Sequence, residues 1–185
     1  MVRVFISGSM RIRHLDNNVL SRINNILEKN YGVIVGDADG VDSSVQEYLK
    51  QNGAKSVLVY CTGSRPRNNL GNWETNNVST TSKPGTRAYF TAKDLEMAND
   101  CDYGLMVWDS KSTGTLSNAV ELLSRRKKSL VYVNKTKEFV TVSDVNDLKR
   151  LLEHMSPSSL TKAEEKLRIT NKIESFSHEQ IELFA

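Results

Sequence analysis

Short apolar runs alternate along the chain with segments in which apolar residues recur at helical spacing. The five runs are rich in β-branched and aromatic residues and cover positions 2–6, 32–35, 56–60, 103–108 and 129–133. Nearly continuous apolar runs of this length are typical of strands that are covered on both faces. The pattern therefore predicts five buried strands of a parallel sheet.

The segments between these runs have the apolar spacing of amphipathic helices. Between the first two runs the spaced residues are Leu15, Val19, Ile23, Ile26 and Leu27, and further sets follow the second and fourth runs. Alternating strands and helices favour right-handed crossovers and helices on both faces of the sheet. We therefore predict an α/β fold: a three-layer Rossmann-like sandwich with a five-stranded parallel sheet in the order 3-2-1-4-5. Ligands bind such sheets at the carboxyl ends of the first and fourth strands, where the strand order reverses.

Two segments depart from this alternation. Residues 61–86 are rich in Asn, Thr, Ser and Gly, and a loop of about 25 residues in a compact domain is usually functional or disordered. We expect a mobile flap beside the site there, an additional edge strand at 139–142 and a helix at 144–155. A Rossmann-like nucleotide-binding domain is thus assigned to residues 1–155.

A helical C-terminal extension is predicted for residues 156–185. Thr161 with Glu164, and Ser177 with Gln180, have the spacing of capping boxes, which predicts two short helices. Six apolar residues would either pack on the domain or form a subunit contact, which makes a homodimer a reasonable expectation: Leu160, Leu167, Ile173, Phe176, Ile181 and Leu183.

Composition adds that the chain is an ordinary globular one, with 38% hydrophobic and 25% charged residues. Met1 leads directly into an apolar run without the flanks of a secretory signal, and no run reaches the roughly 20 residues of a membrane helix. Cys61 and Cys101 lie far apart without metal-ligand spacing, which favours free thiols, a cytoplasmic location and no metal site. We expect no membrane partner and no separate cofactor.

The charge distribution is uneven although the net charge is only +3. The segment between positions 61 and 93 contains five basic residues and only one acidic residue, Glu74. The basic residues are Arg65, Arg67, Lys83, Arg87 and Lys93. This local excess suits an anionic ligand or a polyanion, and it equally suits a solvated loop.

Two candidate ligand-binding clusters follow the first and second strands. The first contains a glycine that permits close approach of a ligand, with a hydroxyl and a guanidinium beside it: Gly8, Ser9, Met10 and Arg11. The second combines glycines with carboxylates that could cap the next helix, or bind a ribose diol or a cation: Asp37, Asp39, Gly40 and Asp42. Asp37, directly after the strand, is the candidate for ligand contact.

The third cluster joins the fourth strand to its helix. It contains one glycine among several hydroxyls, with an amide on the following turn: Asp109, Ser112, Thr113, Gly114, Thr115 and Asn118. The first turn of a helix has unpaired N–H groups and a partial positive charge, so a phosphate is stabilised there. Capping of the helix would need only one of these hydroxyls, and we therefore predict a phosphate-binding turn. The Gly-Lys-Ser/Thr ending of a Walker loop is missing.

These three clusters together resemble the SLOG-type Rossmann-like superfamily. The resemblance covers roughly residues 2–134 and rests on Ser7-Gly8-Ser9, on residues 36–42 and on Ser112-Thr113-Gly114-Thr115. The superfamily includes cytokinin-activating phosphoribohydrolases (lysine-decarboxylase-like proteins) and the DNA-processing protein A fold. Residues 93–128 are also similar to nucleoside deoxyribosyltransferases and deoxynucleotide N-glycosidases. The resemblance implies a phosphate-binding site for a nucleotide or its derivative.

The chain departs from these hydrolases at the position of their essential glutamate. After Gly114-Thr115 the corresponding residue is Asn118, and an amide can serve neither as a nucleophile nor as a general base. We therefore expect a protein that binds a nucleotide or nucleotide derivative, with a sensor as one form that such a protein can take. The alternative is an N-glycosidase that uses Asp37, Asp109 or Glu121 instead. A nucleic-acid-associated protein that uses the basic flap residues Arg65, Arg67 and Arg87 is the weakest hypothesis.

Overall fold

A computed structural model describes the fold of residues 1–184 and the side-chain environments of residues 1–178. Seven strands form one sheet in the order β4-β3-β2-β1-β5-β6-β7. They are β1 (Arg3–Gly8), β2 (Gly32–Gly36), β3 (Val57–Thr62), β4 (Glu74–Val78), β5 (Tyr103–Trp108), β6 (Ser129–Val133) and β7 (Glu138–Val142). All neighbours are parallel except β6 and β7. The five predicted strands and their order are confirmed. The sheet has two more strands than predicted.

The two additional strands lie at the edges of the sheet. β7 corresponds to the edge strand expected at 139–142. β4 lies inside the segment that was expected to be a flap, and it pairs with β3 from Leu58↔Glu74 to Thr62↔Val78. Its sequence, Glu-Thr-Asn-Asn-Val, has no apolar run, because an edge strand with exposed side chains does not need one. Hydrophobic patterning therefore could not reveal it.

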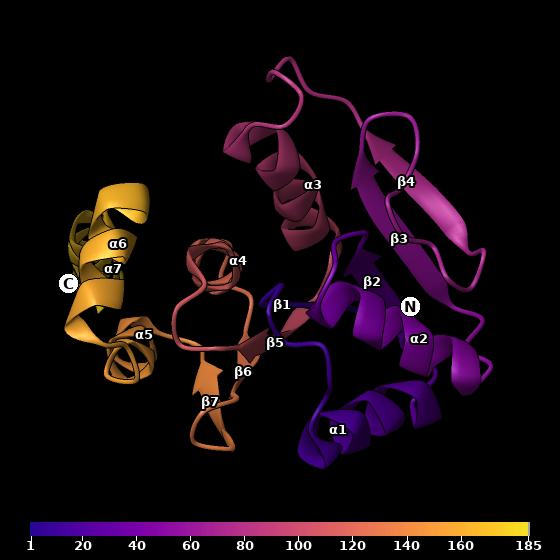
Figure 1. Cartoon of the computed structure of the whole chain (residues 1–185). Helices are drawn as coiled ribbons and strands as arrows, with labels where there is room; N and C mark the ends of the chain where they lie inside the picture. The colour runs from indigo at the N-terminus through magenta and orange to yellow at the C-terminus, as the bar shows by residue number, and fades with distance from the viewer. Residues whose placement is uncertain (185) are drawn as a thin grey trace.

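Helices cover both faces of the sheet (Figure 1). On one face α1 (Asn17–Glu28) and α2 (Val41–Gln51) pack their buried aliphatic residues against the inner strands. On the other face lie α3 (Arg87–Asp100), α4 (Thr113–Ser124) and α5 (Val145–Leu152). Within the described residues, no helix is both long and apolar enough to cross a membrane. The arrangement brings the N-termini of α2 and α4 to the carboxyl ends of β2 and β5.

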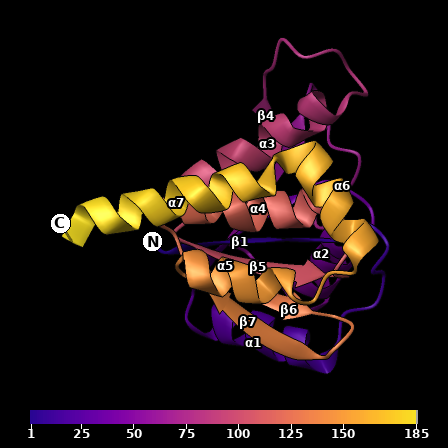
Figure 2. The ribbon, with the colours of Figure 1, turned by 90° about the vertical axis from the view of Figure 1, so that its left-hand side faces the viewer.

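The C-terminal helices α6 (Pro157–Leu167) and α7 (Ile169–Phe184) form an outer layer over α4 and α5 (Figure 2). Ala163 and Ile169 are buried in the same core as the sheet. Four of the six apolar residues noted in the sequence pack against that core: Leu160, Leu167, Ile173 and Phe176. The side chains of Ile181 and Leu183 lie outside the described residues. Packing on the domain thus accounts for most of this apolar surface without a second subunit.

The helix starts within the extension differ from the expected ones. Ser156 is the N-cap of α6, and its hydroxyl accepts a hydrogen bond from the Ser159 N–H. The hydroxyls of Thr161 and Ser177 instead donate to carbonyls one turn earlier, so both residues lie inside helices. The capping-box interpretation was therefore wrong, although two helices are present.

Candidate functional site

A cavity of about 450 Å³ lies at the carboxyl ends of β1, β2 and β5. Ser7 and Gly8 at the end of β1 form part of its wall, and Gly8 has no room for a side chain because a β-carbon would collide with the Val107 carbonyl. The first two turns of α2, α3 and α4 supply most of the remaining wall. The cavity thus coincides with the reversal of strand order, and its volume is within the usual range for small-molecule sites.

The N-terminus of α4 lies at one end of this cavity. Ser112 is the N-cap, and its hydroxyl accepts a hydrogen bond from the Thr115 N–H (3.3 Å). Within the described part of the chain, the N–H groups of Thr113 and Gly114 have no partner. A β-carbon on Gly114 would meet nothing closer than the Ser112 hydroxyl at 3.9 Å, so these donors are accessible. The turn can therefore bind an anion through its backbone.

The loop that leads into α4 is shaped by side chains behind the cavity wall. One carboxylate oxygen of Asp109 accepts from the N–H groups of Lys111 (2.9 Å) and Ser112 (2.7 Å). The buried Ser9 hydroxyl accepts from the Asp109 N–H (3.1 Å) and contacts the Thr115 hydroxyl. Ser110 has a φ of 62°, a conformation that costs a non-glycine residue roughly 1–2 kcal/mol. Asp109 and Ser9 thus position the turn and do not line the cavity.

Four cationic side chains line the cavity, against two carboxylates. The cations are Arg67, Arg87, Lys93 and Lys166, and the carboxylates belong to Asp42 and Asp94. Lys166 comes from α6, so the C-terminal extension contributes to the site. Sequence reasoning missed this residue, because nothing in the spacing of the extension indicates which residue faces the domain.

Two apolar side chains are exposed at the same cavity. Met10 is 56% exposed and Phe90 is 36% exposed, and both line the wall. The Arg67 guanidinium stacks over the Phe90 ring at 4.7 Å. Phe90 was not singled out in the sequence, where it lies within the helical segment after the polar loop. Solvent-accessible apolar surface at a polar cavity suits a flat ligand group such as a nucleobase.

The floor of the cavity contains buried charges. Lys93 is 4% exposed, and its ammonium donates to the Asp94 carboxylate (2.7 Å). Burial opposes the charge of Lys93, but the nearby carboxylates of Asp94 and Asp42 outweigh it and raise the pKa of the ammonium. Burial raises the pKa of Asp42 to about 7, although Lys93 acts in the opposite direction. In the sequence, Lys93 was noted only as part of the local excess of basic residues.

Asp37, the expected ligand contact, is instead engaged with the connection between β3 and β4. Arg67 donates to its two carboxylate oxygens (2.7 and 3.1 Å), and the Arg67 N–H adds a third bond (2.9 Å). Burial raises the pKa of Asp37, but the hydrogen bonds from Arg67 outweigh it and the net shift is downward. Gly40 has a φ of 78°, and a β-carbon there would collide with the Met10 backbone. Both residues therefore shape the wall from behind.

The three carboxylates that were to replace the missing glutamate do not line this cavity: Asp37, Asp109 and Glu121. Glu121 pairs with Arg125 on the outer surface of α4 (2.8 Å). Asn118 does line the cavity, and its amide donates to the Ser7 hydroxyl (3.2 Å). Arg11 and Arg65 are exposed and lie outside the wall.

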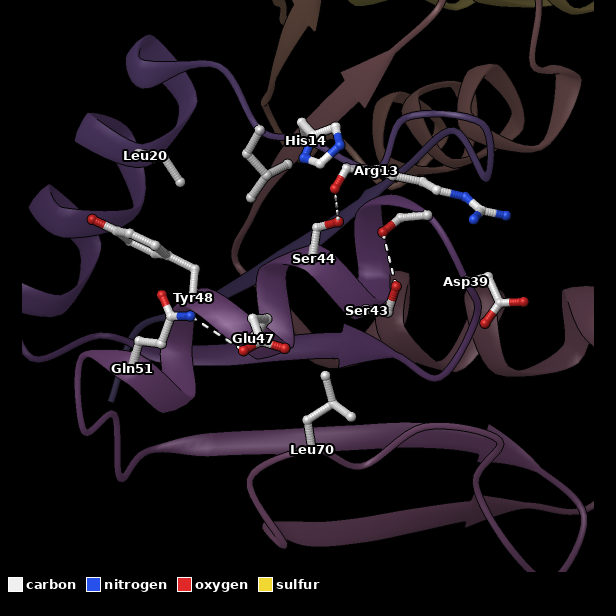
Figure 3. Close-up of a pocket in the computed structure, with 12 residues that line it drawn as sticks. Arg13, His14, Leu20, Asp39, Ser43, Ser44, Glu47, Tyr48, Gln51 and Leu70 are labelled. Atoms are coloured by element: carbon white, nitrogen blue, oxygen red, sulfur yellow. Dashed lines mark hydrogen bonds between the residues drawn. The ribbon is translucent and has the colours of Figure 1, made fainter.

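A larger hollow of about 580 Å³ lies beside α2, between α1 and the β3–β4 connection (Figure 3). Its hydroxyls are already engaged: Ser43 donates to the Gly40 carbonyl, Ser44 to the Arg13 carbonyl and Tyr48 to Asn24. Arg13 shares the wall of this hollow with two carboxylates, those of Asp39 and Glu47. This hollow therefore offers an anion much less than the smaller cavity does.

No family model matches this chain, and a search of curated proteins finds no significant match. The mostly parallel α/β sheet is shown by the structure itself, and the SLOG resemblance stays a prediction. Among the described residues, no group of three or more His, Cys, Asp or Glu side chains is arranged to hold a metal ion.

Proposed function

We propose that this protein binds a nucleotide or nucleotide derivative in the cavity at the end of β1. The observation that carries the proposal is the pair of unpartnered N–H groups of Thr113 and Gly114, which open onto a cavity lined by four cationic side chains. A phosphate bound there would accept from both N–H groups and gain the charge of the helix terminus. Lys166 and Arg87, from two other helices, supply mobile counter-charges.

The rest of the wall supports a ligand larger than a phosphate ion. Met10 and Phe90 offer apolar surface on which a base can stack, and stacking on an aromatic residue contributes roughly 1–3 kcal/mol per base. Asn118 keeps a carbonyl oxygen free to accept from a sugar or base edge while its amide group is held by Ser7. A charged end, an apolar surface and polar groups between them match the parts of a nucleotide.

Recognition is better supported than catalysis. The carboxylates of Asp37, Asp109 and Glu121 are held by other groups away from the cavity, and Asn118 stands where related hydrolases have a glutamate. A nucleic-acid partner is less supported, because Arg67 is committed to Asp37. This leaves Arg65, between β3 and β4, and Arg87, at the start of α3, as the exposed arginines of the expected basic flap.

Mass spectrometry of small molecules released from denatured protein, with thermal-shift measurements across nucleoside mono-, di- and triphosphates, tests the proposal. We expect at least one nucleotide to raise the melting temperature. Lys166→Gln should weaken its binding roughly tenfold, because a charge-assisted bond is lost. Lys111→Gln is the matched control, since Lys111 is exposed next to the same turn but does not line the cavity. Absence of any bound or stabilising nucleotide would contradict the proposal, and base release during incubation would favour the hydrolase alternative.

A further inference from the structure

Asp42 and Lys93 lie close to each other on the floor of the cavity. Asp42 lies in the first turn of α2 and Lys93 in α3, and both side chains are almost completely buried while lining the cavity wall. They meet beneath the end of β2, where a β-carbon on Gly36 would collide with the Asp42 carboxylate and lie 2.8 Å from the Lys93 nitrogen. Glycine at position 36 is therefore required to admit this pair.

The hydrogen bonds of this pair are incomplete. One Asp42 oxygen, Oδ2, accepts a long bond from the Ala38 N–H (3.3 Å), and the other, Oδ1, has no partner among the described residues. The Lys93 ammonium donates to Asp94 and has two further protons to donate. Buried polar atoms are nearly always satisfied, and the residues that carry this unused acceptor and these unused donors line the cavity, so a ligand group bound there can complete both.

The charges on the floor restrict what that group is. A second anion would meet the carboxylates of Asp42 and Asp94, and a cation would meet the Lys93 ammonium. A neutral hydroxyl avoids both repulsions, because it can donate to a carboxylate and accept from an ammonium at the same time.

The floor also lies at a suitable place relative to the phosphate turn. The ends of β2 and β5 are separated by β1, which is hydrogen-bonded to both. Two strand spacings amount to roughly 10 Å, a separation that a sugar with its phosphate can bridge. A ligand whose phosphate binds at α4 can therefore reach the floor with its sugar.

We propose that Asp42 and Lys93 bind a ribose hydroxyl of the ligand, which donates to the Asp42 carboxylate and accepts from the Lys93 ammonium, so that the site selects a ribonucleotide over the deoxy counterpart that lacks this hydroxyl. This inference rests on the proposed nucleotide site and names its substrate class. It assigns the sugar contact to Asp42, whereas the sequence favoured Asp37 for ligand contact.

The test compares ribonucleoside 5′-monophosphates of the four common bases with their 2′-deoxy and 3′-deoxy counterparts by isothermal titration calorimetry. For the base that binds best, the ribonucleotide should bind about tenfold or more tightly than at least one deoxy counterpart, since a hydrogen bond to a charged group is lost. Asp42→Ala should abolish this discrimination. Asp39→Ala, a change of the same charge in the same loop, should keep it, because Asp39 is exposed and does not line this cavity.

Equal binding of a ribonucleotide and of both its 2′-deoxy and 3′-deoxy counterparts by the unaltered protein would overturn this inference and leave the nucleotide site standing. Discrimination that persists in folded Asp42→Ala protein, with folding checked by circular dichroism, would overturn the role of Asp42. Failure of every monophosphate, diphosphate and triphosphate to bind would overturn the proposed function itself. The comparison on the unaltered protein needs no variant, so a folding defect of Asp42→Ala cannot hide the answer.

Discussion

Gly114 occupies the second position of α4, in front of the backbone donors that would hold a phosphate. A glycine at this position lowers the stability of the helix, but it leaves the backbone N–H groups open to a ligand. Its φ is not positive and its surroundings leave room for a β-carbon, so neither strain nor a clash requires glycine here.

Gly114→Ala should therefore stabilise the fold and weaken the ligand. Because alanine reduces the entropy of the unfolded chain, the free energy of unfolding should rise by about 0.4–1 kcal/mol. The added methyl group lies beside the Thr113 and Gly114 donors, so the affinity for the best nucleotide should fall. Urea denaturation measures the stability and calorimetry measures the affinity. A variant that gains stability without losing affinity for the nucleotide would argue against a phosphate at this turn.

The buried carboxyl of Asp42 predicts an unusual dependence of stability on pH. Its pKa of about 7 in the folded protein lies above the ordinary value of 3.8, so between about pH 4 and pH 7 the folded state holds a proton that the unfolded state has lost. Asp42 therefore makes the free energy of unfolding fall as pH rises through this window, by at most about 1.4 kcal/mol per pH unit.

Asp42→Asn should remove that fall, because the amide does not titrate. Urea denaturation at several pH values between 4 and 7 should show the variant gaining stability relative to the unaltered protein as pH increases. Asp39→Asn serves as the control and should follow the unaltered protein. Parallel curves for Asp42→Asn and the unaltered protein would show that Asp42 is already ionised across the window.

At this scale the sequence indicated the residue types of the site better than their roles. Asp37, Asp42 and Asp109 all lie near the expected strand ends, but only Asp42 lines the cavity. Which carboxylate faces the cavity depends on Arg67, which lies 30 positions away from Asp37 and binds it from the connection between β3 and β4. Local sequence carries no information about such a long-range partner.

The connection between β3 and β4 is an element that is fixed at several points. Arg67 binds Asp37, the Asn68 amide donates to the Asp37 carbonyl, and the Leu70 N–H donates to the Gln46 side chain. These bonds attach the connection to the end of β2 and to α2. The connection has no apolar run of its own. Hydrogen bonds that involve side chains therefore hold it against β2 and α2.

Arg67→Ala should loosen this connection and lower stability. The bidentate bond is half-exposed, which reduces its electrostatic contribution, but its loss leaves the buried Asp37 carboxylate with the Arg67 N–H alone. We expect a loss of about 1–2 kcal/mol in urea denaturation and faster hydrogen exchange of the connection. Arg65→Ala is the control, since Arg65 is exposed on the same connection; equal effects of both changes would contradict the tethering role.

Element prediction succeeded where burial imposes a pattern and failed where it does not. The inner strands lie beneath helices on both faces, so their apolar runs were unmistakable. The edge strand β4 forms its backbone hydrogen bonds with β3 and has mostly polar side chains, so the composition of this segment resembles that of a loop. The predicted starts of the two C-terminal helices were wrong, because Ser and Thr hydroxyls also donate hydrogen bonds to backbone carbonyls inside helices.

For the whole molecule, the C-terminal helices belong to the same packed unit as the sheet. Ile169 at the start of α7 is 4% exposed, and it belongs to a core that extends through α4 and α5 to β5 and β6. Unfolding of the extension would therefore expose apolar surface of the domain itself, and the two should unfold together.

Ile169→Ala should lower the stability of the entire protein by about 2–4 kcal/mol, the usual cost of removing a buried isoleucine side chain. Tryptophan fluorescence and far-ultraviolet circular dichroism should report one coincident urea transition at lower midpoint. Leu95→Ala, at a site that is 43% exposed on α3, is the control and should change little. A separate early transition in Ile169→Ala would show that the extension melts independently.

Because Lys166 lies near the C-terminal end of the chain, the cavity wall is completed late in protein synthesis. The cavity wall contains residues from Ser7 to Lys166, so the last wall residue leaves the ribosome after every strand of the sheet has been synthesised. Chains fold as they emerge, at about 5–20 residues per second, so an emerging domain passes through a period in which its strands are complete but its site is not. On the proposed function, full affinity for the ligand phosphate is therefore expected only of chains that have been translated past α6.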